Sequence, residues 1–79
     1  MNTAQRLTEV FREVFNDPTL VITPEMTAKD VDGWDSFSHS NLIVALELGF
    51  GIKFSQRELL TFRKVGDMLL SIQGKLDRA

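Results

Sequence analysis

The sequence predicts an all-α domain, a four-helix bundle with a long first loop and a short third helix. Apolar residues recur at helical spacing in three stretches, and residues typical of helix ends stand between them. The first two stretches are separated by one long connection that has two prolines, a glycine and no sustained period. A chain of 79 residues suffices for one core, so we expect a single domain over residues 1–79.

The first helix is expected over about residues 3–16. Thr3 can cap its start, and Asp17-Pro18 ends it because proline cannot continue the helical hydrogen bonding. The buried face consists of residues spaced at i, i+3, i+4, i+7 and i+8, namely Leu7, Val10, Phe11, Val14 and Phe15.

The connection over residues 17–35 is longer than structureless loops usually are. Such a loop is either functional or held in place by burial. We favour burial through spaced apolar side chains, which are Leu20, Ile22, Met26 and Val31.

The second helix is predicted over residues 36–50. It starts at the capping signal Asp35-Ser36 and ends near Gly49 and Gly51. Its buried stripe is Leu42, Ile43, Leu46 and Phe50, with Phe37 one turn earlier.

Ser55 and Glu58 have the spacing of a capping box, which predicts a short third helix over residues 56–61. A fourth helix is predicted over about residues 65–75, with Gly74 near its end. Its apolar face is Val65, Leu69 and Ile72.

Composition and charge exclude several classes of function. The formal net charge is −2, and residues 1–34 carry three basic against six acidic residues, so we expect no nucleic-acid partner. No apolar run approaches the roughly 18 residues of a membrane span, and the amphipathic N-terminus lacks the apolar centre of a signal peptide. These features favour a cytoplasmic location. One histidine and no cysteine give no metal-ligand set.

Asp35 and Ser36 are the first candidates for function, although the pair taken alone is only a helix cap. The alternative hypothesis is therefore a small helical protein–protein interaction module without a prosthetic group, in which Ser36→Ala costs about 0.5–2 kcal/mol of stability. Asp35, Ser36 and His39 could also suggest a hydrolase triad. Triads are generally assembled from separate segments, and no glycine-rich oxyanion element is present, so we expect no catalytic residue.

The surroundings of Ser36 carry a family resemblance. The run Gly33-Trp34-Asp35-Ser36-Phe37 opens an amphipathic helix after a long loop, and it resembles the Asp-Ser-Leu signature of the acyl carrier proteins and their peptidyl and D-alanyl carrier relatives. The resemblance covers essentially the whole chain. It rests on register as well, because further residues stand at the family's spacing from the serine, namely Leu42, Ala45-Leu46-Glu47, Phe50, Val65 and Ile72.

This resemblance implies a bundle of acyl-carrier type in which Ser36 bears a 4′-phosphopantetheine arm, attached by a phosphopantetheinyl transferase that uses coenzyme A. It implies that Asp35 assists the transferase through Mg²⁺. Phe37 would flank the arm, or its ring could instead close the top of the core. The resemblance also implies that the protein is a monomer and is not itself an enzyme. Its arm would hold an acyl or aminoacyl group as a thioester for partner ligases or synthases.

Candidates for partner contact lie on or beside the second helix, namely Trp34, His39, Asn41, Glu47 and Leu48. Trp34 is either an exposed interface anchor or a half-buried plug of the loop, and Leu48 is either an exposed contact or a core residue. Fatty-acid carriers usually show several acidic residues along this helix, whereas here only Asp35 and Glu47 are acidic. Docking should therefore depend less on charge, which favours a specialised lipid, polyketide or secondary-metabolite pathway over primary fatty acid biosynthesis.

The sequence does not determine which cargo the arm carries. Phenylalanines could line a cavity for a fatty chain or fill that space, and filling is the default in a close-packed core. Filling would favour short acyl, aminoacyl or partner-presented cargo. The residues concerned are Phe11, Phe15, Phe37, Phe50, Phe54 and Phe62.

Overall fold

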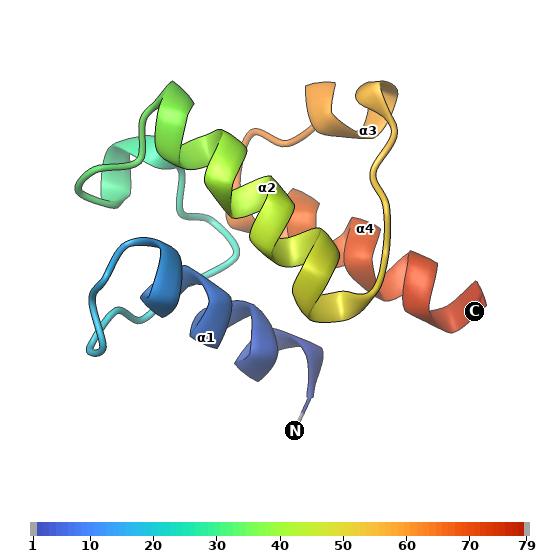
Figure 1. Cartoon of the computed structure of the whole chain (residues 1–79), viewed down its shortest axis with the longest axis horizontal. Coiled ribbons are helices and arrows are strands. Elements are labelled where there is room, and N and C mark those ends of the chain that lie inside the picture. The colour runs from blue at the N-terminus through green and yellow to red at the C-terminus, as the bar shows by residue number, and fades with distance from the viewer. Residues whose placement is uncertain (1, 79) are drawn as a thin grey trace.

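The computed structural model describes residues 2–78, with side chains for residues 2–77. This part of the chain forms four α-helices and one 3₁₀ helix without any strand, which confirms the predicted all-α fold. α2 crosses the middle of the molecule, α1 packs against both α2 and α4, and α3 stands apart beyond them (Figure 1). Within these residues no helix is long and apolar enough to cross a membrane. The elements are α1 (Thr3–Val14), the 3₁₀ helix η1 (Ala28–Asp30), α2 (Ser36–Phe50), α3 (Gln56–Leu60) and α4 (Val65–Arg78).

The ends of α1 differ from the prediction. Asn2, rather than Thr3, is the N-cap, because its side chain accepts a hydrogen bond from the Gln5 amide at 2.8 Å while the Gln5 side chain accepts one from the Asn2 amide. The helix stops at Val14, two residues early. Asn16 then takes a left-handed φ of 51°, which asparagine tolerates better than most residues, so the chain turns before it reaches the proline.

The later helices keep their predicted starts. α2 ends as predicted, with Gly51 in the left-handed region at a φ of 67° and its amide bonded to the Glu47 carbonyl. α3 is one residue shorter than predicted, because Thr61 is its C-cap. α4 runs three residues beyond Lys75, since Gly74 costs only about 1 kcal/mol inside a helix and does not end it.

The long loop is held by burial and by α4. Val31 is buried, and Leu20, Ile22 and Met26 pack against the core, as predicted. The first two amides of α4 donate to loop carbonyls: Val65 to Met26 and Gly66 to Pro24, each at 2.9 Å. A Cβ on residue 66 would lie 3.0 Å from the Pro24 oxygen, so this approach favours glycine.

The core draws its side chains from α1, α2 and α4. Burying each of them contributes about 1.5–3 kcal/mol. Helical spacing predicted every member except Met68, and it wrongly added Phe37, which is 77% exposed. The core is Leu7, Phe11, Leu42, Leu46, Phe50, Val65, Met68 and Ile72.

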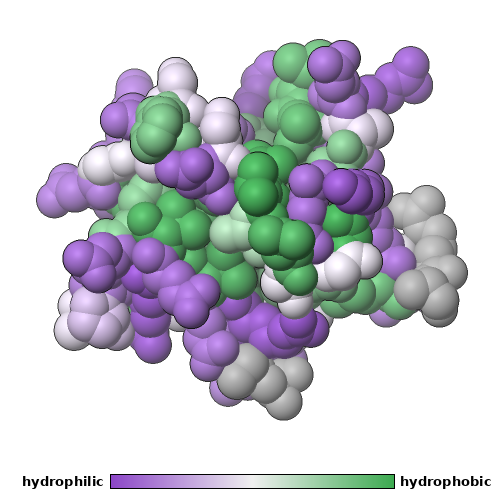
Figure 2. Space-filling model, viewed as in Figure 1, coloured by the Kyte–Doolittle hydropathy of each residue, from purple (hydrophilic) through white to green (hydrophobic). Residues whose placement is uncertain are grey.

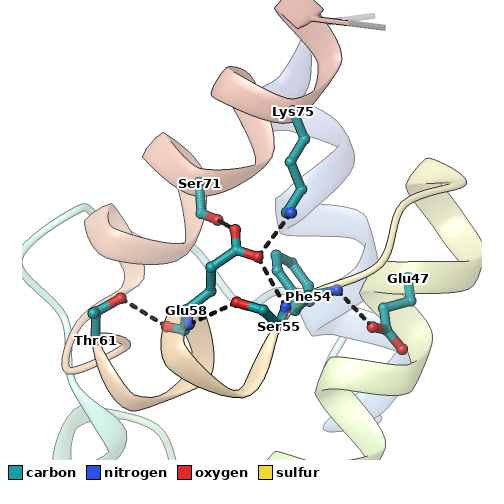
Figure 3. Close-up of polar contacts among 7 residues, drawn as sticks. All are labelled: Glu47, Phe54, Ser55, Glu58, Thr61, Ser71 and Lys75. Carbon is teal, nitrogen blue, oxygen red and sulfur yellow. Dashed lines mark hydrogen bonds and ion pairs between the residues drawn. The ribbon is translucent and has the colours of Figure 1, made fainter.

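α3 buries none of its side chains and is held by polar contacts instead. Glu58 closes the predicted capping box with Ser55, and its carboxylate also accepts hydrogen bonds from Lys75 at 2.8 Å and from Ser71 at 2.9 Å (Figure 3). The same carboxylate therefore starts α3 and ties it to α4. On the other side of the loop, the Glu47 carboxylate accepts the Phe54 amide at 2.8 Å.

Candidate functional site

The start of α2 is a fully formed capping box. The Asp35 carboxylate accepts the Ser38 amide at 2.9 Å, and the Ser38 hydroxyl accepts the Asp35 amide at 2.8 Å and donates to the Gly33 carbonyl at 2.5 Å. Sequence reasoning found the cap but missed Ser38. The Asp-x-x-Ser spacing is the signal that could have found it, although the usual partner at that position is Glu or Gln.

Ser36 is the first residue of α2 and is exposed. Among residues 2–77 its hydroxyl takes part in no hydrogen bond, because Asp35 and Ser38 already satisfy the cap. The hydroxyl therefore stands at a helix N-terminus, where the amide dipoles favour negative charge, and is free to react.

The Asp35 carboxylate stays ionised beside it. Hydrogen bonds from the backbone amide and then the hydroxyl of Ser38 hold the pKa of Asp35 below its usual value. In the part of the chain with described side chains, no group of three or more potential metal ligands gathers here or elsewhere.

Trp34 is half-buried and plugs the loop against α1. Its ring meets Phe11 edge-on with centroids 5.3 Å apart and lies 5.9 Å from Phe15. Its indole Nε1 donates to His39 Nδ1 at 3.0 Å. This bond needs an unprotonated Nδ1, and burial lowers the pKa of His39. His39 is therefore a neutral structural partner of Trp34 at neutral pH.

These contacts leave no hydrolase triad. The Asp35 carboxylate is bonded to Ser38, and His39 Nδ1 accepts from Trp34. Neither group orients the other toward Ser36.

A shallow groove of about 440 Å³ opens beside Ser36. Its walls come from η1, the start of α2 and the connection between α3 and α4, which lie at the same end of the molecule. Four of the predicted site residues meet here, together with Phe62, which the sequence offered as a possible cavity residue. Ala28 and Arg63 were not singled out, because their placement depends on how both loops fold back. The lining residues are Ala28, Trp34, Asp35, Ser36, His39, Phe62 and Arg63.

The fold has a close counterpart of known structure. A solution NMR structure of a holo acyl carrier protein from Geobacter metallireducens superposes with a TM-score of 0.91, and the two sequences are 47% identical over 99% of this chain and 90% of that chain. The chain belongs to the acyl carrier protein family. No family model and no curated protein matches it.

The remaining predicted site residues of this acyl carrier protein lie along α2, outside the groove. Phe37 and Leu48 are 77% and 80% exposed, so the alternatives that placed each of them in the core are wrong. Asn41 is exposed between them, whereas Glu47 is partly buried and bonded to the Phe54 amide. Val44, at 54% exposed, extends the same face and was not predicted.

The outward face of α2 is therefore largely apolar, with exposed Asn41 as a polar residue within it. Figure 2 shows apolar atoms over the middle of this helix, on the face turned toward the viewer. Phe37, Val44 and Leu48 follow one another at spacings of seven and four residues, which places them on one side of the helix.

Proposed function

We propose that this acyl carrier protein holds acyl or aminoacyl intermediates as thioesters on a 4′-phosphopantetheine arm attached to Ser36, and delivers them to partner ligases or synthases. One observation carries the proposal: in a chain of this family, Ser36 is exposed at the first residue of α2, and its hydroxyl forms no hydrogen bond with any of residues 2–77.

The residues fit the arm. A phosphodiester on Ser36 would gain about 0.3–1 kcal/mol from the helix N-terminus. Asp35 opposes part of this gain through its own negative charge, but its exposed carboxylate is available to assist a phosphopantetheinyl transferase through Mg²⁺ while coenzyme A is bound. The chain supplies no catalytic group of its own, since the thiol at the end of the arm holds the cargo.

The proposal also concerns the kind of pathway that the protein serves. The outward face of α2 offers apolar Phe37, Val44 and Leu48, and the Glu47 carboxylate is engaged within the chain. We propose that partner enzymes recognise this apolar face rather than a row of acids, which favours a specialised lipid, polyketide or secondary-metabolite pathway. A cytoplasmic monomer over residues 1–79 remains part of this proposal.

The test is modification in vitro. The purified protein is incubated with coenzyme A, Mg²⁺ and a broad-specificity phosphopantetheinyl transferase, and its intact mass is measured. Wild type and the matched control Ser40→Ala should each gain one arm, and Ser36→Ala should gain none. A helical interaction module would stay unmodified, and a wild type that several transferases leave unchanged would overturn the proposal.

A further inference from the structure

The surface around α3 has a charge opposite to that of the N-terminal half. Residues 51–68 carry four basic against two acidic residues, whereas residues 1–34 carry three basic against six acidic. In residues 51–68 every basic residue is exposed and neither acidic residue is. The exposed cations are Lys53, Arg57, Arg63 and Lys64.

The side chains of these four cations have no partner within the chain. Among residues 2–77 they form no ion pair and no hydrogen bond, and Arg63 and Lys64 are bonded only through their backbone amides, to Asp67. By contrast, Arg12 on α1 donates to the Leu20 carbonyl. The fold therefore uses Arg12 for its own contacts and leaves the charges around α3 available to a partner.

The acidic side chains of this region are engaged by other parts of the chain. The Glu58 carboxylate points from α3 toward α4, where Ser71 and Lys75 donate to it (Figure 3). The Asp67 carboxylate accepts two backbone amides of the turn between α3 and α4. The exposed surface of α3 and of this turn is therefore positive.

An exposed leucine lies among the cations. Leu60 is 82% exposed and follows Arg57 by three residues, on the same side of α3. Figure 2 shows apolar and hydrophilic atoms side by side over the region of α3, at the upper right of the view. An apolar centre with a polar rim is the usual anatomy of a protein interface.

We propose that α3 and the turn after it form a second docking surface, which binds an acidic surface of an enzyme that loads or removes the cargo. This inference rests on the proposed function, because only a carrier needs such enzymes. Arg63 also lines the groove beside Ser36, so an enzyme bound here lies within reach of a group attached to that serine. Opposite charge would select this partner, whereas the apolar face of α2 contributes little charge.

Two other anionic partners match the surface less well. A single exposed leucine buries too little apolar area to hold the protein on a membrane. The acidic N-terminal half would repel the phosphates of a nucleic acid. Both partners are included in the test as competitors.

The probe is a synthetic helical peptide with glutamates around a stripe of leucines, titrated into the modified protein and followed by ¹⁵N–¹H NMR. We expect amide shifts in residues 53–64 and weaker binding at moderate than at low salt. The same peptide with lysines in place of the glutamates should leave these amides unshifted. Vesicles of phosphatidylglycerol and a DNA duplex at the same salt should bind more weakly, and tighter binding of either would make the acidic protein partner wrong.

Neutral variants test the cations and the leucine. Combining Arg57→Gln, Arg63→Gln and Lys64→Gln should weaken binding of the acidic peptide about tenfold, and Leu60→Ala about threefold. Lys29→Gln, at an exposed cation outside this surface, is the matched control and should bind as wild type does. Unchanged amide signals in α1 and α2 confirm that each variant is folded.

The outcomes separate the two proposals. Intact mass is checked first, and a wild type that gains no arm overturns the proposed function, while titration of the unmodified chain still tests the surface. Shifts confined to α2 with both peptides, or undiminished binding by the triple variant, overturn the docking surface on α3. The triple variant should gain its arm as fast as wild type. If it is modified more slowly, the surface serves the transferase and its assignment to a cargo enzyme is wrong.

Discussion

Asp35, Ser36 and Ser38 have different roles at the start of α2. Asp35 and Ser38 satisfy each other's amides, and this exchange leaves the Ser36 hydroxyl without a hydrogen bond among residues 2–77. With the arm on Ser36, as we propose, this arrangement means that modification breaks no hydrogen bond donated by the hydroxyl to another of residues 2–77.

Substitution of the serines should therefore separate stability from function. We expect Ser36→Ala to change the free energy of unfolding by no more than about 0.5 kcal/mol, since it removes no hydrogen bond. Ser38→Ala removes half of the capping box and should cost about 0.5–2 kcal/mol. Urea unfolding of both variants measures these free energies. If Ser36→Ala loses as much stability as Ser38→Ala, Ser36 acts as a helix cap and the separation of roles is wrong.

His39 gives a prediction about pH. Burial lowers its pKa in the folded protein, so the unfolded chain binds the proton more readily. Stability is thus at its full value above the unfolded pKa of about 6.5 and falls as the pH drops below it, while the bond from Trp34 is lost. We expect the melting temperature of wild type to fall between about pH 7.5 and about pH 5.5. His39→Gln, which keeps an acceptor but does not titrate, should show a smaller fall, and an equal fall would assign the effect to other groups.

Single residues show where sequence reasoning reaches its limit. Asp35 was predictable as a cap because a cap is a local device. The bond between Trp34 and His39 was not, since it exists only because the loop folds back and sets the indole on α1. That Arg63 lines the groove was likewise not predictable, because it lies far along the chain from Ser36 and reaches the groove only through the fold.

At the scale of elements, α3 is too short to be stable alone and has no buried side chain, so Glu58 is its main attachment. Hydrogen bonds from Lys75, then from the Ser55 amide and Ser71, lower the pKa of Glu58 to about 2. Stability that depends on the ionised carboxylate is therefore present above the usual pKa of about 4.5 and is lost as the pH falls from there toward 2.

Neutralising this residue should loosen α3 selectively. We expect Glu58→Gln to cost about 0.5–1.5 kcal/mol and to raise amide hydrogen exchange in α3 while exchange in α1 stays unchanged. Glu25→Gln, at an exposed glutamate of the long loop, is the matched control. It should neither lower the free energy of unfolding nor raise amide exchange in α3. If amide protection across α3 in Glu58→Gln equals that in wild type, this role of Glu58 is wrong.

The elements themselves were largely predictable, and their ends were less so. Apolar periodicity located all the long helices because their buried faces repeat every three to four residues. The end of α4 was missed because a glycine close to a helix end need not stop it, and the cap of α1 because Asn2 and Thr3 are both acceptable N-caps. A capping box is a stronger signal, and Ser55 with Glu58 marked the start of α3 correctly.

At the scale of the whole molecule, the apolar face of α2 is the surface on which we propose that partners dock. With Phe37, Val44 and Leu48 outward and Glu47 bonded to Phe54, docking gains little from long-range charge. We expect the transferase kcat/KM on this chain to change by less than about twofold between low and moderate salt, where exposed charges become screened. Asn41→Glu, which adds an exposed carboxylate between the apolar residues, should introduce a clear salt dependence, and a strong dependence already in wild type would contradict apolar docking.

The central claim is that the molecule presents one serine for modification, and its position within α2 tests that claim most directly. Cleavage at Lys29 and Lys53 yields a peptide over residues 30–53 that contains Ser36, Ser38 and Ser40. After the transferase reaction, fragmentation of this peptide by tandem mass spectrometry should place the arm on Ser36 alone. An arm on Ser38 or Ser40, or an unmodified peptide, would contradict the account.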